Sequence, residues 1–320
     1  MKNIKEIAGK ILNLSSEEKV SEGIYATLED LIEQRRYINF VNYHNKKTTF
    51  SKSAGDIKSA FKGRGMEFDQ IRSYQYGDEV RDIDWRVTAR KMTPYTKIYN
   101  EERNRDVYVF LDLSPSMVFG TKRELKSVAA AKIAGLLGWI SFENKDKFGC
   151  LIYDGSEYFF YKPQNSRAAL LAVLKKMSEI GKSAALDKKM SKEDSGGFEK
   201  SLRMLQKNIK SRAEIFLISD FYMFDDKVKK SLAALSKKGK LYLIDVFDRI
   251  EKSAPRSGEY MISDGDKNLI FDTGNDNFKD EYAKYFVHKS KLIKDFCLKF
   301  SFDYMSVSTA IPIFRQIKLG

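Results

Sequence analysis

The sequence predicts an α/β protein with a doubly wound, mainly parallel sheet, and three observations indicate it. From residue 106 onward, short apolar runs alternate with amphipathic helical segments, the pattern of strands joined by helical crossovers. The runs are apolar at consecutive positions, as in strands covered by helices on both faces. Hydrophobic residues make up 42% of the 320 residues, which is enough to build a sizeable core.

The residues ahead of this domain give a different pattern. Apolar residues at helical spacing predict a helix over 17–37. The polar stretch 45–65 is expected to be a loop, and 66–104 is expected to form short strands and turns. The chain therefore divides into a helical segment over 1–54, a strand-and-turn segment over 55–105 that packs on the main domain, and an α/β domain over 106–320.

Within the α/β domain the elements can be assigned in order along the chain. Strands are expected at 107–111, 148–153, 158–161, 215–219, 241–247 and 304–307. Helices are expected at 122–142, 166–179, 198–210, 226–237 and 277–299. Two hairpins are expected, one across Asp154-Gly155 and an inserted one over 258–273 that turns at Asp264-Gly265.

The net charge of +13 is concentrated in two stretches. Residues 157–212 hold 13 Lys and Arg against 6 Asp and Glu, and residues 225–240 hold six Lys against two Asp. Such stretches attract nucleic acid, anionic lipid or acidic protein, although a solvated helix face has the same composition. Few aromatic residues lie among these lysines, which does not favour a platform for single-stranded nucleic acid.

Cysteine, histidine and hydropathy exclude several further classes. Two Cys without C-x-x-C spacing and two distant His exclude a disulfide scaffold, a Cys-built zinc site and an H-E-x-x-H site. The N-terminus lacks the apolar core of a signal peptide, and the longest apolar run, about 128–142, is too short to span a bilayer. We therefore expect a cytoplasmic protein without a transmembrane segment.

Two carboxylates follow buried strands of the predicted sheet. Asp112 follows the strand 107–111, and Asp220 follows the strand 215–219. Ligands of open α/β sheets bind beyond the carboxyl ends of the strands. The loop continues as Asp112-x-Ser114-x-Ser116, and one carboxylate with two hydroxyls suits a magnesium ion. The alternative is that both serines merely cap the next helix.

This loop resembles the metal-ion-dependent adhesion site of von Willebrand factor A domains. Over about residues 55–320 the sequence also resembles, more specifically, the bacterial family catalogued as domain of unknown function 58. The motifs that support this resemblance are Gly63-Arg64-Gly65-Met66-Glu67-Phe68, Ile71-Arg72-Ser73-Tyr74-Gln75-Tyr76-Gly77-Asp78, Arg81-Asp82-Ile83-Asp84-Trp85, Thr88-Ala89-Arg90, Glu101-Glu102-Arg103, Asp112-Leu113-Ser114-Pro115-Ser116-Met117 and Phe119-Gly120.

The resemblance implies a Rossmann-type, von Willebrand A-like domain that acts as a non-catalytic adaptor for a MoxR-type AAA+ ATPase. It also implies that Ser114 and Ser116 bind magnesium directly, and that Asp112 and Asp220 bind it mostly through water.

One departure from the adhesion-site pattern affects the expected metal. The usual threonine ligand comes from a turn before a later helix, and Phe198 stands at that position. A phenyl ring cannot bind a metal, so either Asp194 or Ser195 takes the role of the threonine, or the site is weak or empty.

Catalytic alternatives lack necessary residues. A haloacid-dehalogenase-like site needs a carboxylate where Ser114 stands, and a P-loop ending at 181–183 needs glycine where Lys176 stands. A serine nucleophile would need a nearby histidine, and Cys150 and Cys297 lie in apolar surroundings. We expect no enzyme. The two alternatives that stay open are an electrostatic binder of nucleic acid or anionic membrane, and a metal-dependent phosphoester hydrolase at the two strand-end aspartates.

The segment 74–90 combines many charges with a single tryptophan. It is predicted as a strand and turn in which Ile83, Trp85 and Val87 alternate inward onto the domain. It either clamps the N-terminal segment to the domain or offers Arg81, Asp84 and Arg90 to a partner through charged hydrogen bonds.

Overall fold

The computed structural model describes residues 23–41, 66–101, 105–186, 195–210, 212–253, 258–263, 268–272 and 276–318. The chain forms two compact units, one of residues 45–104 and the other of residues 1–44 and 105–320. Each unit is described separately below. The predicted loop over 45–65 and the start of the predicted N-terminal helix lie outside the described residues.

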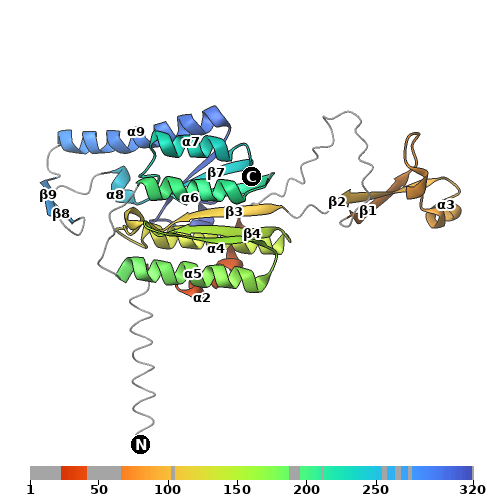
Figure 1. Ribbon diagram of the computed structural model, residues 1–320, viewed down its shortest axis with the longest axis horizontal. Helices are drawn as coiled ribbons and strands as arrows, with labels where there is room; N and C mark the ends of the chain where they lie inside the picture. The colour runs from red at the N-terminus through yellow and green to blue at the C-terminus, as the bar shows by residue number, and fades with distance from the viewer. Residues whose placement is uncertain are drawn as a thin grey trace, which may run out of the picture. The chain divides into compact units, whose positions relative to one another are not determined.

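The larger unit is built on a six-stranded sheet with the order β10-β7-β6-β3-β4-β5 (Figure 1). Its strands are β3 (Asp106–Asp112), β4 (Lys147–Tyr153), β5 (Tyr158–Gln164), β6 (Ala213–Ser219), β7 (Gly239–Phe247) and β10 (Asp303–Ser308). β5 pairs antiparallel with β4, and the other pairings in this sheet are parallel. The predicted mainly parallel sheet is confirmed, and each predicted strand falls within an observed one.

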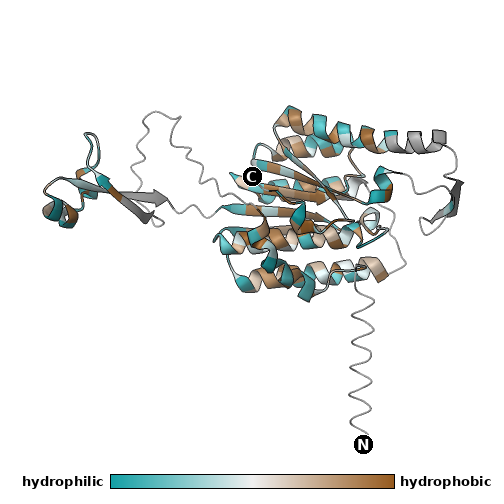
Figure 2. Cartoon of the chain, turned by 180° about the vertical axis from the view of Figure 1, so that it is seen from behind, coloured by the Kyte–Doolittle hydropathy of each residue, from teal (hydrophilic) through white to brown (hydrophobic). Residues whose placement is uncertain are grey.

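Helices cover both faces of this sheet. α4 (Lys126–Glu143) and α5 (Arg167–Leu186) contribute to one core cluster, and α6 (Ser195–Asn208), α7 (Asp226–Leu235) and α9 (Asp276–Phe300) contribute to the other. Figure 1 shows the two helical layers on opposite sides of the strands, and Figure 2 shows hydrophobic residues concentrated in the strands between them. The alternation of strands and helices along the sequence therefore produces the predicted layered α/β architecture.

Two small elements complete the larger unit as described. α8 (Arg249–Lys252) follows β7, and β8 (Glu259–Ser263) pairs antiparallel with β9 (Asn268–Asp272). This pairing agrees with the inserted hairpin predicted over 258–273, but its predicted turn at Asp264-Gly265 lies outside the described residues.

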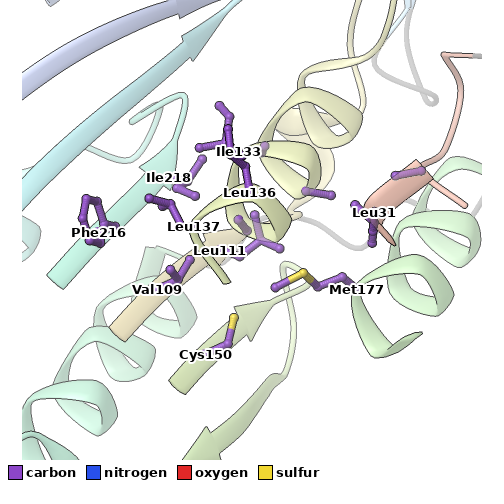
Figure 3. Close-up of a cluster of buried hydrophobic side chains, with 14 of the residues drawn as sticks. Leu31, Val109, Leu111, Ile133, Leu136, Leu137, Cys150, Met177, Phe216 and Ile218 are labelled. Carbon is purple, nitrogen blue, oxygen red and sulfur yellow. The ribbon is translucent and has the colours of Figure 1, made fainter. Parts of the chain in front are cut away.

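A short N-terminal helix and the 3-10 helix that follows it pack on α4. α2 (Leu28–Glu33) begins at a capping box between Thr27 and Asp30, and the 3-10 helix η1 (Gln34–Phe40) follows directly. The indole Nε1 of Trp139 donates to the carbonyl of Leu31 at 3.0 Å, and Leu31 lies beside the core formed by β3 and α4 (Figure 3). Of the helix predicted over 17–37, the structure confirms Leu28–Glu33. The prediction is wrong over 23–27, where the chain is not yet helical, and after Glu33, where the last turns tighten to 3-10 geometry.

The smaller unit is a hairpin with a helical insertion. β1 (Met66–Ser73) pairs antiparallel with β2 (Tyr95–Glu101), and the 3-10 helix η2 (Val80–Asp82) and helix α3 (Trp85–Lys91) lie between them. The predicted inward alternation of Ile83, Trp85 and Val87 along a strand is wrong. The Asp84 carboxylate accepts from the backbone N–H groups of Arg86 and Val87, and this cap starts a helix instead.

Trp85 is 64% exposed, whereas the predicted strand would have buried its indole ring. The packing of this segment on the main domain stays a prediction. Along the described ranges, no helix is long and apolar enough to cross a membrane.

Candidate functional site

The carboxyl ends of β3 and β6 lie side by side where the order of the sheet reverses. β3 leads to β4 on one side, whereas β6 pairs with β3 on the other. Asp112 is the last residue of β3, and Asp220 follows the last residue of β6. The topology therefore brings both sequence-predicted aspartates to the switch point, where α/β sheets bind ligands.

Asp112 is buried, and each of its oxygens accepts a hydrogen bond, one from the loop that follows and one from β6. Its Oδ1 accepts from the backbone N–H of Ser114 at 2.9 Å, and its Oδ2 accepts from the hydroxyl of Ser219 at 2.6 Å. The hydroxyl oxygens of Ser114 and Ser116 are 3.4 Å apart. Burial, and next the negative charge of Asp220, raise the pKa of Asp112 to about 7.

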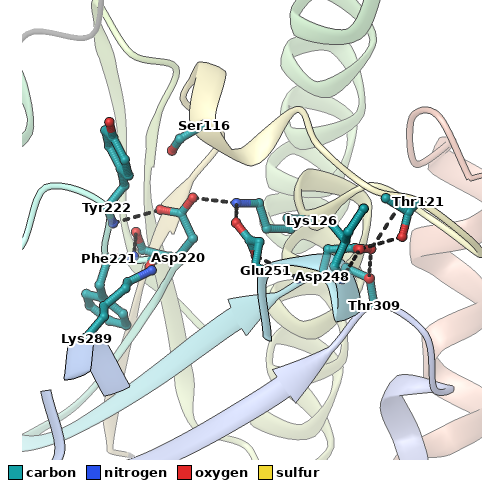
Figure 4. A network of polar contacts seen from close by, with 12 residues as sticks. Ser116, Thr121, Lys126, Asp220, Phe221, Tyr222, Asp248, Glu251, Lys289 and Thr309 are labelled. Atoms are coloured by element: carbon teal, nitrogen blue, oxygen red, sulfur yellow. Dashed lines mark hydrogen bonds and ion pairs between the residues drawn. The ribbon is translucent and has the colours of Figure 1, made fainter. Parts of the chain in front are cut away.

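Asp220 is equally buried but has cationic neighbours (Figure 4). Its Oδ1 accepts from the backbone N–H of Tyr222 at 2.9 Å, and its Oδ2 accepts from the ammonium of Lys126 at 2.7 Å. Lys289 of α9 donates to the backbone carbonyl of Asp220. Burial alone would raise the pKa of Asp220, but the charges of Lys126 and Lys289 hold it below its ordinary value.

Lys126 is the site residue that the sequence did not predict. It is the first residue of α4, its side chain is 3% exposed, and its ammonium donates to Asp220 at 2.7 Å and to Glu251 at 2.8 Å. Burial lowers the pKa of Lys126, but the two carboxylates outweigh burial and raise it above its ordinary value. The sequence offered one weak signal, a lysine in the first turn of a mainly apolar helix, where the helix dipole disfavours a positive charge.

Glu251 is held in place by Asp248, the residue that follows β7. Asp248 and Glu251 form a capping box at the start of α8, in which the backbone N–H of Asp248 donates to Glu251 Oε2 at 2.8 Å. The Asp248 carboxylate accepts further hydrogen bonds from Thr121 and Thr309. Burial raises the pKa of Asp248, but these hydrogen bonds outweigh it and lower that pKa.

A fifth carboxylate, Asp245 on β7, is 1% exposed. The hydroxyl of Tyr304 donates to its Oδ2 at 2.7 Å, and its Oδ1 has no hydrogen-bond partner among the described residues. Burial raises the pKa of Asp245 to about 6.

The loop after Asp220 presents an aromatic side chain at this edge. Phe221 has φ 49°, the left-handed region that costs a non-glycine residue of order 1 kcal/mol or more. Its backbone N–H donates to Ser219, and its ring is 2% exposed. Tyr222, the next residue, is 64% exposed, so the strained turn buries one aromatic ring and leaves the next one in solvent beside the buried charges.

The residues present do not fit the magnesium site implied by the resemblance. Both oxygens of Asp220 are engaged, one of them by an ammonium. Phe198, at the threonine position, is 4% exposed and packs edge-on against Phe110 and Tyr153. Asp194 lies outside the described residues, and the side chain of Ser195 is not described. In the part of the chain that the structure describes, no three His, Cys, Asp or Glu side chains gather as a metal site.

Arg81, Asp84 and Arg90 belong to the smaller unit. Arg81 and Arg90 are exposed, and Asp84 caps α3 and pairs with Lys97 at 3.5 Å. Their predicted role in partner binding stays a prediction, and Asp84 has a structural role besides.

The fold and the switch-point edge define a Rossmann-like α/β protein with a buried charge cluster at its sheet edge. The chain belongs to the family described as "Protein of unknown function DUF58", whose model matches residues 70–291. Uncharacterized proteins of Mycobacterium bovis and Mycobacterium tuberculosis are each 25% identical over 235 residues, which is 72% of this chain and 70% of theirs.

Two solved structures are similar to part of the chain at 14% identity. One is the conserved hypothetical protein BatB from Bacteroides thetaiotaomicron, with a TM-score of 0.36 over 64% of this chain and 90% of that one. The other is an uncharacterized membrane spanning protein from Vibrio fischeri, with a TM-score of 0.23 over 64% of this chain and 91% of that one.

Proposed function

We propose that this protein is a non-catalytic, cytoplasmic interaction module of the von Willebrand A type that docks a partner protein on the carboxyl-end edge of its sheet. The proposed partner is a MoxR-type AAA+ ATPase, as the family resemblance implies, and the ATPase supplies the nucleotide chemistry. The Asp-x-Ser-x-Ser loop after the first strand of the sheet supports the von Willebrand A-like assignment, because it lies at the switch point.

The observation that supports docking at this edge is the exposed side chain of Tyr222. The turn that holds it there contains Phe221 in the left-handed conformation. The backbone N–H of Phe221 donates to Ser219, and the backbone N–H of Tyr222 donates to Asp220. Strained, over-determined turns cluster at functional sites. Tyrosine is among the residues that contribute most to protein interfaces, since it offers a large apolar area with a polar end at low entropic cost.

The burial of the carboxylates beneath this turn supports a binding role over catalysis. Asp112 and Asp220 are each 2% exposed and hold backbone and side-chain donors of their own loops. A general base must reach the proton it removes, and these oxygens are already engaged within the fold. The phosphoester hydrolase alternative therefore has no supporting observation at this site.

Affinity capture of the MoxR-type ATPase from the same genome tests the proposal. The wild type and Phe40→Ala, which removes an aromatic ring that is 65% exposed on another element, should bind equally. Tyr222→Ala should lose about 30-fold in affinity, as expected for an interface residue worth roughly 2 kcal/mol.

The same preparation should alter the ATP turnover of the ATPase and hydrolyse no ATP by itself. Two results would contradict the proposal: undiminished capture by Tyr222→Ala, or robust ATP hydrolysis by the purified chain alone. Capture that disappears on moderate addition of salt would instead favour the electrostatic binder.

A further inference from the structure

The ammonium of Lys126 is enclosed at the strand-end site between two carboxylates from different segments. Its distances to Asp220 Oδ2 and Glu251 Oε1 are 2.7 and 2.8 Å, and the lysine side chain is 3% exposed. Figure 4 shows it reaching from the start of α4 toward Asp220, with the backbone of Tyr222 on the opposite side of that carboxylate. The residues that it joins are 94 and 125 positions away along the chain, so this contact depends on the assembled fold.

We infer that the Lys126 ammonium is the resident cation of this site and stands in place of a divalent metal. Partner docking at the edge is consequently independent of divalent ions. This second statement rests on the proposed function, whereas the first concerns the isolated chain.

The hydrogen bonds of Asp220 support this inference. A carboxylate that serves a hydrated metal must offer an oxygen to the metal or to one of its waters. Asp220 Oδ1 accepts from the backbone N–H of Tyr222, and Oδ2 accepts from the ammonium. A divalent ion close to Oδ2 would also meet the positive charge of Lys126, and repulsion between charges a few ångströms apart is strong in a buried site.

The position of Phe198 supports it independently. This side chain is fixed in the core by edge-on contacts with Phe110 and Tyr153, at centroid distances of 5.1 and 5.7 Å. It supplies no oxygen donor. At the threonine position the side of α6 therefore offers a phenyl ring instead of an oxygen ligand, and the side of α4 offers an ammonium.

Magnesium titration of the purified chain tests the inference without any partner. The wild type should show no binding heat and no change in thermal midpoint. Lys126→Met keeps the buried stem but removes the charge that joins Asp220 and Glu251, and leaves Lys289 as the cationic neighbour of Asp220. This variant should gain magnesium binding, with a midpoint increase of roughly 5 °C at about 100 times the Kd. The added change Asp220→Asn should abolish the gain.

Lys132→Met is the matched control. Lys132 lies on the same helix and forms an ion pair with the buried Glu124 at 2.6 Å, but Glu124 is not part of the strand-end site. This variant should lose stability without gaining a response to magnesium.

Two outcomes overturn the inference. One is magnesium binding by the wild type that Asp220→Asn or Asp112→Asn abolishes. This measurement does not use Lys126→Met, so it tests the inference even if that variant does not fold. The other is a folded Lys126→Met protein without a magnesium response. Because no partner is present, neither outcome bears on docking through Tyr222. Loss of capture from the wild type on chelation would overturn metal-independent docking alone.

Discussion

Replacing Asp245 by Asn should change how the stability of the protein depends on pH. Asp245 lies on β7 at 1% exposure, and burial raises the pKa of its carboxyl from 3.8 to about 6. Its Oδ2 accepts from Tyr304 and its Oδ1 has no hydrogen-bond partner among the described residues. Asparagine keeps the shape and one acceptor for Tyr304, but it cannot ionise.

The sign and size of the effect follow from proton linkage. A folded-state pKa above the unfolded value means that the folded protein keeps a proton which the unfolded chain has lost. The resulting stabilisation is complete below 3.8 and is lost as the pH rises through about 6. The whole effect is about 3 kcal/mol, of which about 2 kcal/mol falls between pH 4 and pH 7.5.

Urea unfolding of the wild type and Asp245→Asn at these two pH values measures the effect. The free energy of unfolding of the variant, minus that of the wild type, should increase by about 2 kcal/mol from the lower to the higher pH, so that the variant becomes relatively more stable. Any constant cost of the substitution cancels in this comparison. The other titrating groups also cancel where the variant leaves them unchanged.

Asp248→Asn is a control with the opposite sign. Hydrogen bonds from Thr121 and Thr309 help to lower the pKa of Asp248 in spite of its burial. Its stabilisation is present above the unfolded pKa and is lost mostly below pH 4, so this variant should be penalised only slightly more at the higher pH, by less than about 0.5 kcal/mol. If the difference between Asp245→Asn and the wild type were the same at both pH values, the reasoning from burial would be refuted.

Two predictions concern the smaller unit. Trp85→Ala should cost less than about 1 kcal/mol in urea unfolding, because the ring is 64% exposed; a cost of about 3 kcal/mol or more would show that the ring is buried against another part of the protein. Asp84→Ala should cost about 1 kcal/mol by loss of the α3 cap, and hydrogen exchange should show faster exchange of the Arg86 and Val87 amides; unchanged exchange would contradict the cap.

The strands of the larger unit could be predicted because their signal is local. A run such as Val107–Leu111 is apolar at every position, which is typical of a strand buried on both faces. The strand-end carboxylates followed from the same signal, since the residue after a buried parallel strand must lie at the functional edge. Asp112 and Asp220 were located in this way, without knowledge of their contacts.

The contacts of Lys126 could not be predicted in the same way. A lysine in the first turn of a helix is ordinary, and its partners Asp220 and Glu251 are supplied by two distant loops. The error at Trp85 has another cause. Apolar residues at 83, 85 and 87 fit a strand, but the Asp84 side chain can cap two amides and start a helix, and that local hydrogen bonding prevailed over the alternation.

The buried charges at the sheet edge are better explained by positioning than by stability. An ion pair such as Lys126 with Asp220, at 3% exposure on both sides, loses in desolvation about as much as it gains in attraction, and apolar residues of the same volume would often serve stability as well or better. The left-handed Phe221 adds a further cost at the same place. Both features act on the position of Tyr222. Lys126 orients the carboxylate of Asp220, and this carboxylate accepts from the backbone N–H of Tyr222, whose side chain is exposed. We therefore infer that the charge cluster serves to orient the side chain that we propose for docking, Tyr222.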